Sequence, residues 1–406
     1  MIPRVTPWLA PVARGLTLLF PIVLLHGRGV ADITLSLVAI LFLAHSALAR
    51  DWSWLRRLWV RLALAWWAWL VICSLRWGAA PGALVTVRFL VFTAALETWV
   101  LREAWMRDWL QRLLRWAAFY LAAQCLLQFV TGRNLYGWPR APDGELTGPY
   151  DKPRTGPILA RLLFPALLPL AATPLRALLW LIAGVTLMVL IGQRMPLLLT
   201  FLGLFTTALF LKQLRMPVLY TAVTAGLLLA LLPQVSPEAA HRIETKFAAQ
   251  MSDFSRNHYG LIAARSIAMV QSDPLMGVGF DGFRRLCDEP RFFHGWHGGD
   301  GGGAMICVQH PHSYYLQALV EGGIPGLLLF AGTAVAWLVA IGRGLFRTPD
   351  PFRVGLFVAT LVQLWPIAGS SDWVAMPLSG WFFVQLGLAL ALASPYMPGP
   401  RQPLEG

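Results

Sequence analysis

Long apolar stretches recur along nearly the whole chain of 406 residues. Each runs for about 17 to 22 residues, enough for a helix to cross a hydrocarbon core roughly 30 Å thick. Only 13% of the residues are charged and 57% are hydrophobic, a balance outside the range of ordinary soluble domains. The sequence therefore predicts an all-α, polytopic membrane protein.

Breaks at charges, prolines and glycines divide the apolar sequence into about twelve predicted spans. The first segment follows Arg4 and Arg14, and we interpret it as a retained helix rather than a signal peptide because more spans follow at once. The predicted spans are 8–25, 30–48, 58–75, 84–101, 110–131, 156–172, 176–192, 195–211, 217–233, 321–342, 353–369 and 379–395.

The distribution of cations predicts the orientation of these spans. Cytoplasmic loops are enriched in Lys and Arg, and alternate loops of this chain hold most of its arginines while the short loops between them hold few. The predicted inner cations are Arg50, Arg56, Arg57, Arg102, Arg107, Arg112, Arg115, Arg176, Lys212, Arg215, Arg343, Arg347 and Arg353. This asymmetry explains most of the formal net charge of +13, so nucleic-acid binding is not needed to account for it. It also predicts that both termini are cytoplasmic.

The same orientation places two long segments on the outer, periplasmic face. The predicted organisation is a first helical region at 1–233 with an outer loop at 132–155, a large outer domain at 234–320, and a last region at 321–406. In the large outer domain, Ser236-Pro237 predicts the start of a helix that carries Ile243 and Phe247.

A second helix is predicted from about Tyr259 to Gln271, ended by Asp273-Pro274. Gly277, Gly279 and Gly282 then permit tight turns, and the glycine-rich stretch 295–303 is expected to be mobile.

The four cysteines fall into two classes. Cys73 and Cys125 lie in predicted spans, where a small buried thiol needs no further explanation. Cys287 and Cys307 lie in the large outer domain, where an oxidising compartment permits a bridge that would restrain the glycine-rich stretch. A bridge and two free thiols are both compatible with the sequence.

A polar segment, His310-Pro311-His312-Ser313-Tyr314-Tyr315, precedes the tenth predicted span at the outer interface. Imidazole exchanges a proton near neutral pH, so a histidine here is suited to activating a hydroxyl nucleophile. The alternative is an ordinary interfacial helix start, with tyrosines in the aromatic belt and solvated histidines.

His312-Ser313, nine residues, Gly323, two residues and Gly326 fit the pattern H-[NSQ]-x9-G-x-x-G. This segment, together with Arg265, the run 274–279 and a large loop between spans nine and ten, resembles the bacterial O-antigen ligases, which are related to the O-antigen polymerases. The resemblance implies a helical membrane glycosyltransferase of the GT-C type in the bacterial inner membrane with a periplasmic active site.

Four arginines stand where topology alone does not favour a cation. Arg194 lies in a short outer turn, Arg265 in the outer domain, and Arg88 and Arg161 inside spans near their outer ends. Guanidinium binds phosphate in bidentate fashion and stays charged. The resemblance implies that Arg194 and Arg265 bind a lipid diphosphate, and Arg88 and Arg161 either join them or extend to the interface.

The implied reaction transfers O-antigen polysaccharide from undecaprenyl diphosphate to a sugar hydroxyl of lipid A core. The implied roles are His312 as base and the arginines as diphosphate ligands, with support from His310, Ser313 and Tyr314. Direct displacement would invert the anomeric centre. We expect no cofactor, and the expected partners are the lipid-linked donor, the lipid A core acceptor and membrane lipids.

Three alternatives remain open at this point. A metal-dependent transferase is disfavoured because the sequence has no D-x-D motif. The nearest segment, Asp143-Gly144-Glu145, is better explained as a turn. His294, His297 and Asp300 form only a weak metal-ligand pattern. An O-antigen polymerase would use the same donor. A lipid or anion transporter would show internal repeats and charges at the midplane, which the sequence does not suggest.

Overall fold

The computed structural model describes residues 7–235, 237–241, 252–368 and 372–394. The described chain is helical, with isolated β-bridges at Arg133–Pro139 and Trp296–Gly298 as its only extended pairs. Each of the twelve predicted apolar segments falls on a helix. The helix predicted to begin at Ser236-Pro237 is described only at Pro237–Ala240; Ser236, Ile243 and Phe247 lie outside the described residues.

The helices follow the predicted spans closely. In chain order they are α1 (Leu9–His26), α2 (Arg28–Ala49), α3 (Leu58–Leu75), α4 (Ala80–Val85), α5 (Val87–Ala95), α6 (Ala104–Thr131), α7 (Thr155–Leu167), α8 (Pro174–Ile191), α9 (Arg194–Phe210), α10 (Arg215–Val235), α11 (Pro237–Ala240), α13 (His258–Ser272), α14 (Gly282–Leu286), α15 (Tyr314–Gly342), α16 (Pro351–Leu364) and α17 (Leu378–Ala393). The fourth predicted span is built from three successive pieces, α4, α5 and a π-helical turn at Leu96–Val100.

Eight helical segments of the described chain are long and apolar enough to cross a membrane. The shorter apolar helices α7, α9, α16 and α17 coincide with the other four predicted spans. The chain is therefore a polytopic helical membrane protein, while the count of twelve crossings remains a prediction.

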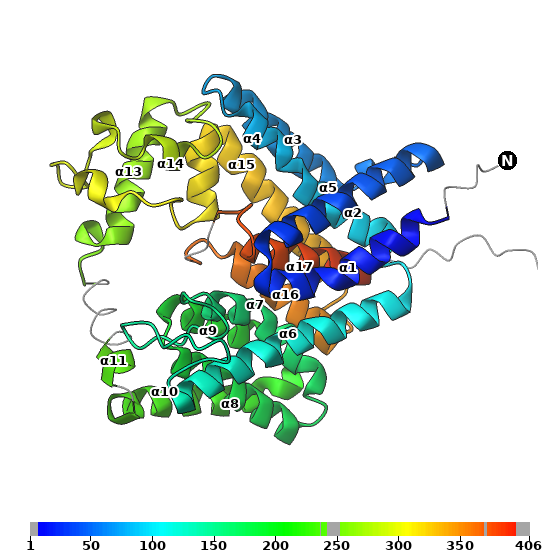
Figure 1. Cartoon of the computed structure of the whole chain (residues 1–406), viewed down its shortest axis with the longest axis vertical. Helices are drawn as coiled ribbons and strands as arrows, with labels where there is room; N and C mark the ends of the chain where they lie inside the picture. Colours follow the sequence, from blue (N-terminus) through cyan, green and yellow to red (C-terminus); the bar gives the residue numbers. More distant parts are fainter. Residues whose placement is uncertain (1–6, 236, 242–251, 369–371, 395–406) are drawn as a thin grey trace, which may run out of the picture.

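The helices pack around a central layer that includes α1, α2, α5 and α17 (Figure 1). On one side of this layer α15 packs along α3; on the other, α7 packs against α6, α9 and α16. α16 also contacts α17 and α15, so it joins the two sides. Trp337 and Trp381, at 1% and 0% exposure, are the largest apolar side chains enclosed by this bundle.

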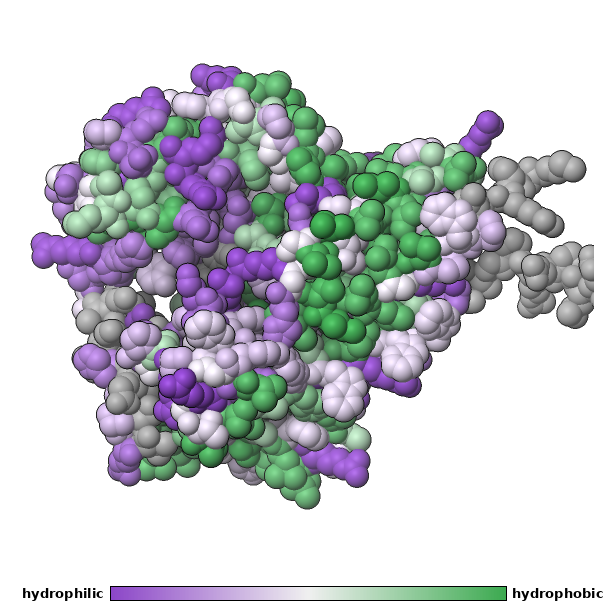
Figure 2. Space-filling model, viewed as in Figure 1, coloured by the Kyte–Doolittle hydropathy of each residue, from purple (hydrophilic) through white to green (hydrophobic). Residues whose placement is uncertain are grey.

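The described part of the predicted outer domain, formed by α13, α14 and the loops up to Pro311, packs against the beginning of α15 (Figure 1). Its own apolar cluster is small and includes Ile262, Met269, Val278, Phe283 and Phe292. Figure 2 shows hydrophilic residues gathered on the side of the molecule that carries this domain, around a hollow between it and the lobe of α8 and α10; apolar residues cover α1 and α2.

Helix α15 breaks at Gly323, where φ is 63° and ψ is −163°. The predicted turn segment 274–279 lies against this break: the N–H of Val278 donates to the Val320 carbonyl at 2.8 Å, and the N–H of Ile324 donates to the Pro274 carbonyl at 2.8 Å. A Cβ at Gly323 would lie 2.4 Å from the Leu275 oxygen. Glycine at this position therefore permits the close approach of the outer domain to α15.

Candidate functional site

His312 is held in an unusual backbone conformation at the start of α15. Its φ is 56°, in the left-handed region that non-glycine residues seldom adopt. The next residue, Ser313, is the N-cap of α15, and its hydroxyl accepts a hydrogen bond from the Leu316 N–H at 3.3 Å. Since Ser313 caps the helix, α15 begins at Tyr314, earlier than the predicted span, and the turn fixes the direction in which His312 leaves the bundle.

Three rings meet at this turn. The imidazole of His312 lies 4.7 Å from that of His310 and 5.4 Å from the Tyr259 ring, measured between centroids, and both pairs are edge-to-face. Tyr259 belongs to the first turn of α13, so the outer domain contributes one wall of the His312 environment. The structure thus brings together His310 and His312, and adds Tyr259, which the sequence did not single out for this role.

Arg265, on α13, is buried with 0% exposure in the interior of the outer domain. Its guanidinium donates to the Cys287 carbonyl and, at 2.8 Å, to the Gly303 carbonyl, and it lies 4.3 Å from the centroid of the Phe293 ring. Burial lowers the pKa of Arg265, and the Asp300 carboxylate opposes this shift. Arg265 therefore fastens the glycine-rich loop to α13.

Cys287 and Cys307 form a disulfide, with their Cα atoms 5.6 Å apart. Of the two states compatible with the sequence, the structure has the bridge, and Cys73 and Cys125 are buried free thiols in α3 and α6. Arg265 also contacts both bridged sulfur atoms at 3.8 Å. The bridge and the guanidinium thus fix the loop that precedes His310.

A buried polar chain connects the start of α15 to the opposite side of the bundle. The Arg161 guanidinium of α7 donates to the side-chain oxygen of Gln363 in α16, and the Gln363 amide nitrogen donates to the Tyr314 hydroxyl. Arg161 and Gln363 are 1% and 0% exposed. Arg161 is therefore connected to Tyr314, two residues from His312, through Gln363, a residue that the sequence did not indicate.

Arg88, at the start of α5, forms an ion pair with Asp32 of α2, with 2.9 Å between the guanidinium nitrogen and the carboxylate oxygen. The carboxylate compensates the charge of this arginine. Neither of the two sequence interpretations, diphosphate binding or extension to the interface, included this partner.

Arg194 is the first residue of α9 and follows a tight turn closed by Gly192, whose φ is 78°. The turn is packed closely: the neighbouring Gln193 donates to the Pro153 carbonyl at 3.1 Å and contacts Glu145 at 3.4 Å. A Cβ at Gly156, in the first turn of α7, would lie 2.1 Å from the Gln193 side chain. The position of Arg194 is thus fixed by the loop 132–155 and by α7.

A second group that sequence reasoning missed lies one helical turn beyond Tyr314. Gln317 donates to Glu321 and to Asp372, each at 3.0 Å, and the Asp281 N–H donates to Glu321 at 3.0 Å. Burial, and then the Asp372 carboxylate, raise the pKa of Asp281. These contacts join α15, the outer domain and the segment before α17, and a pattern search could have found only Glu321, as a carboxylate inside an apolar run.

Outside the immediate surroundings of His312, a polar cavity of about 250 Å³ is lined by parts of α1, α2, the loop 132–155 and the segment before α17. Arg28 and Arg154 both line it, as do Trp138 and Tyr150. Tyr150 has a buried hydroxyl without a hydrogen-bond partner. Asp151 lines it as well, so two arginines outnumber one carboxylate beside two aromatic rings, a lining that suits a phosphorylated sugar.

The described residues contain no group of three or more His, Cys, Asp or Glu side chains placed to hold a metal ion. Within the weak ligand pattern of the sequence, the His294 imidazole contacts the Arg291 carbonyl at 3.1 Å, and Asp300 accepts from the Gly302 N–H at 3.0 Å. Asp143-Gly144 lies in a turn, in which the Gly144 N–H donates to the Ala141 carbonyl at 2.8 Å.

The four arginines singled out in the sequence therefore have different surroundings in the structure. Arg161 is connected to Tyr314 through Gln363, and Arg265 fixes the loop before His310. Arg88 is paired with Asp32. Arg194 lies at the start of α9, next to the outer loop 132–155.

Comparison with known families gives one match. Residues 177–331 match the family model described as O-antigen ligase. The matched region runs from α8 into α15 and includes Arg194, Arg265 and His312, while Arg88 and Arg161 fall outside it. The match covers less than half of the chain and shows that this region is similar to the O-antigen ligase family; no curated protein matches the chain.

Proposed function

We propose that this chain, with its O-antigen ligase region at 177–331, transfers O-antigen polysaccharide from undecaprenyl diphosphate to a sugar hydroxyl of lipid A core. The family supports a ligase or polymerase type of function in lipopolysaccharide biosynthesis. The observation that carries the proposal is the fixed backbone of His312 at the outer end of α15, next to Tyr259 and His310.

The proposed reaction is a single displacement. The acceptor hydroxyl oxygen forms a bond to the anomeric carbon, the bond between that carbon and the diphosphate oxygen breaks, and its electron pair leaves with the diphosphate. His312 takes the hydroxyl proton. The donor is already activated, so the reaction needs no nucleotide, and attack opposite the leaving group inverts the anomeric centre.

Arg194 and Arg265 are the proposed ligands of the leaving diphosphate, because fixed cations stabilise charge that develops during the reaction. Arg265 is 0% exposed on the Cys287 and Gly303 carbonyls, so its proposed role requires the glycine-rich loop to uncover the guanidinium. Arg161 and Tyr314 are proposed to position His312 through Gln363. Arg88, His310 and Ser313 are proposed as supporting residues, with Ser313 acting as the helix cap.

The same proposal places the site on the periplasmic face of the inner membrane, with both termini in the cytoplasm. The arginine-rich inner loops support this orientation. The acceptor is proposed to use the cavity lined by Arg28, Arg154 and Trp138, because phosphate and sugar groups suit cationic and aromatic contacts.

His312→Ala tests the proposed base in cells that lack their own ligase. We expect a loss of ligation of about 100-fold or more, because the hydroxyl loses its proton acceptor. Lipopolysaccharide ladders measure the product on lipid A core, and the polymer on the lipid carrier is measured in parallel. The matched control is His297→Ala, an exposed histidine of the same domain.

Long chains that accumulate on the carrier would identify a ligase. Carriers with single repeats would identify the polymerase instead. Normal ladders from the His312 variant would contradict the assignment of the base.

A further inference from the structure

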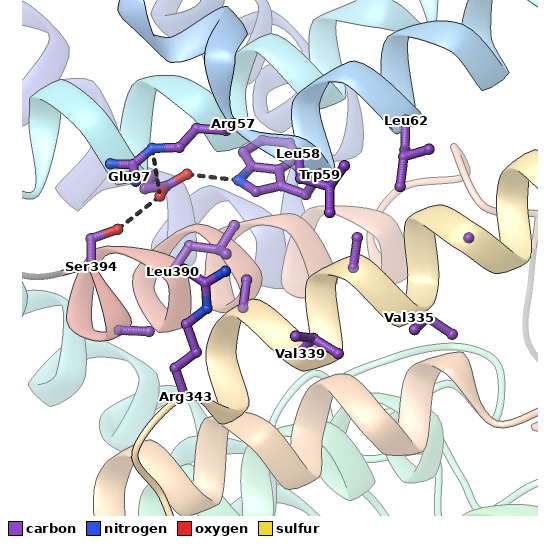
Figure 3. A pocket seen from close by; sticks show the side chains of 14 residues that line it. Arg57, Leu58, Trp59, Leu62, Glu97, Val335, Val339, Arg343, Leu390 and Ser394 are labelled. Carbon is purple, nitrogen blue, oxygen red and sulfur yellow. Dashed lines mark hydrogen bonds and ion pairs between the residues drawn. The ribbon is translucent and has the colours of Figure 1, made fainter.

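At the end of the bundle opposite the outer domain, a cavity of about 270 Å³ lies between α3, α15 and α17 (Figure 3). Its floor is apolar and its rim carries Arg57, Glu97 and Arg343. None of these residues takes part in the proposed reaction, and the family match does not cover Arg57 or Glu97.

The carboxylate at the rim is buried and fully engaged. Glu97 is 7% exposed; it accepts from the Trp59 indole N–H at 2.8 Å and from the Ser394 hydroxyl at 2.8 Å, and its oxygen lies 3.6 Å from the Arg57 guanidinium. Figure 3 shows these three partners converging on the carboxylate. One of the two arginine charges is thereby compensated inside the protein.

Arg343 supplies the second charge. It is exposed at the end of α15 and, among the described residues, its guanidinium has no hydrogen bond or ion pair. Two arginines and one carboxylate leave the rim with a single positive charge. Arg57 also stands at the N-cap of α3, where the helix dipole favours an anion.

Below the rim the cavity is an open apolar groove. Val335 and Val339 of α15 and Leu58 of α3 line it and are 59%, 57% and 59% exposed. A Cβ added at Gly332, also in the lining, meets nothing within 4 Å. Exposed apolar side chains on a membrane helix face lipid chains.

We infer that this cavity binds one anionic phospholipid of the bilayer, with its phosphate on Arg343 and Arg57 and an acyl chain in the groove beside Gly332. The single uncompensated positive charge matches a lipid whose head group carries one negative charge. The arginine distribution predicts that this end of the bundle faces the cytoplasm, so the lipid belongs to the inner leaflet. The inference does not depend on the proposed transferase reaction.

The test is native mass spectrometry of the full chain with added phosphatidylglycerol. We expect one retained lipid per chain. Arg343→Gln should weaken retention roughly fivefold, the contribution of one basic residue at a membrane surface. The matched control is Arg347→Gln, an exposed arginine of the same loop that does not line the cavity.

Gly332→Leu tests the groove separately, because Gly332 lines the groove and a Cβ at this position meets nothing within 4 Å. It should abolish retention of the lipid, whereas Gly226→Leu, at another open glycine, should leave it unchanged. Both variants should keep the melting temperature of the parent chain, which shows that they fold.

Three results would overturn the inference. Equal retention of phosphatidylcholine would show that head-group charge is not recognised. Retention of inorganic phosphate alone to the same extent as phosphatidylglycerol would indicate an anion site that does not need a lipid. Retention unchanged by both Arg343→Gln and Gly332→Leu would place the lipid elsewhere.

Discussion

The helical bundle and the outer domain are held together by different means. In the bundle, long apolar helices enclose large side chains such as Trp337 and Trp381. The outer domain has only a small apolar cluster, and its loops are fixed by the Cys287–Cys307 bridge and by Arg265. The comparison indicates that the bundle gives the chain its stability, while a few specific links in the outer domain determine the surroundings of His312.

The largest effect is expected where the two regions meet. Gly323→Ala would place a side chain in a backbone region that is essentially restricted to glycine, and 2.4 Å from the Leu275 oxygen. We expect a loss of about 4 kcal/mol from strain and overlap together. Thermal unfolding of the purified protein measures the loss.

Gly332→Ala is the control within the same helix, because its Cβ meets nothing. This variant should be neutral or slightly stabilised, since alanine favours a helix. Equal melting temperatures of the two variants would contradict the proposed packing of 274–279 against α15.

The next largest effect is expected from removal of the bridge. Replacing both Cys287 and Cys307 by serine opens a loop with a sequence separation of 20. In the chain-entropy description, a loop of this size contributes about 3 kcal/mol. Hydrogen exchange should increase in the outer domain while the exchange of α3 and α16 stays unchanged; a uniform increase would show that the two regions unfold together.

A smaller effect is expected for Arg265→Lys. Lysine keeps the charge, but it lacks the planar guanidinium that donates to the Cys287 and Gly303 carbonyls at the same time. We expect a local loss of about 2 kcal/mol, as for a buried polar contact left unmade. Hydrogen exchange of the glycine-rich loop measures it, and Arg291→Lys, at an exposed arginine of the same domain, is the control. Identical exchange in both variants would contradict the anchoring role of Arg265.

The smallest effect concerns pH. The folded-state pKa of Asp281 is raised, so its contribution to stability is present below its ordinary pKa and is lost as pH rises through the raised value. Asp281→Asn should therefore be more stable than the parent near neutral pH, by up to about 1 kcal/mol, and equal to it in acid. Asparagine also tolerates the positive φ of 54° at this position. A gain that is independent of pH would exclude ionisation as its cause.

Span positions could be predicted from the sequence because each depends on a continuous apolar run. The sequence placed Cys287 and Cys307 where a bridge could form but did not decide between a bridge and free thiols, and the start of α15 at the Ser313 cap was not predicted. Partners separated by long stretches of chain could not be predicted: Gln363 for Arg161, and Asp32 for Arg88. Such pairs depend on which helices become neighbours, and local pattern does not contain that information.

The candidate site was predictable in its motif and not in its surroundings. His312 stands out by its residue type at the membrane interface. Its neighbour Tyr259 belongs to another helix, and the Gln317, Glu321 and Asp372 contacts require α15, the outer domain and the last helices to be assembled. These contacts reflect tertiary packing, which no single segment encodes.

The hydrogen bonds from Arg161 through Gln363 to Tyr314 all point the same way. The guanidinium donates to the amide oxygen and the amide nitrogen donates to the hydroxyl, so each bond polarises the next in the same sense. A buried positive charge on α7 can thus alter the electron density of a phenol two residues from His312 without contacting it. Gln363→Glu would end this relay, because a carboxylate accepts from both neighbours. Electronic tuning of the imidazole's surroundings is therefore open to variation at Gln363, a buried residue at the end of α16.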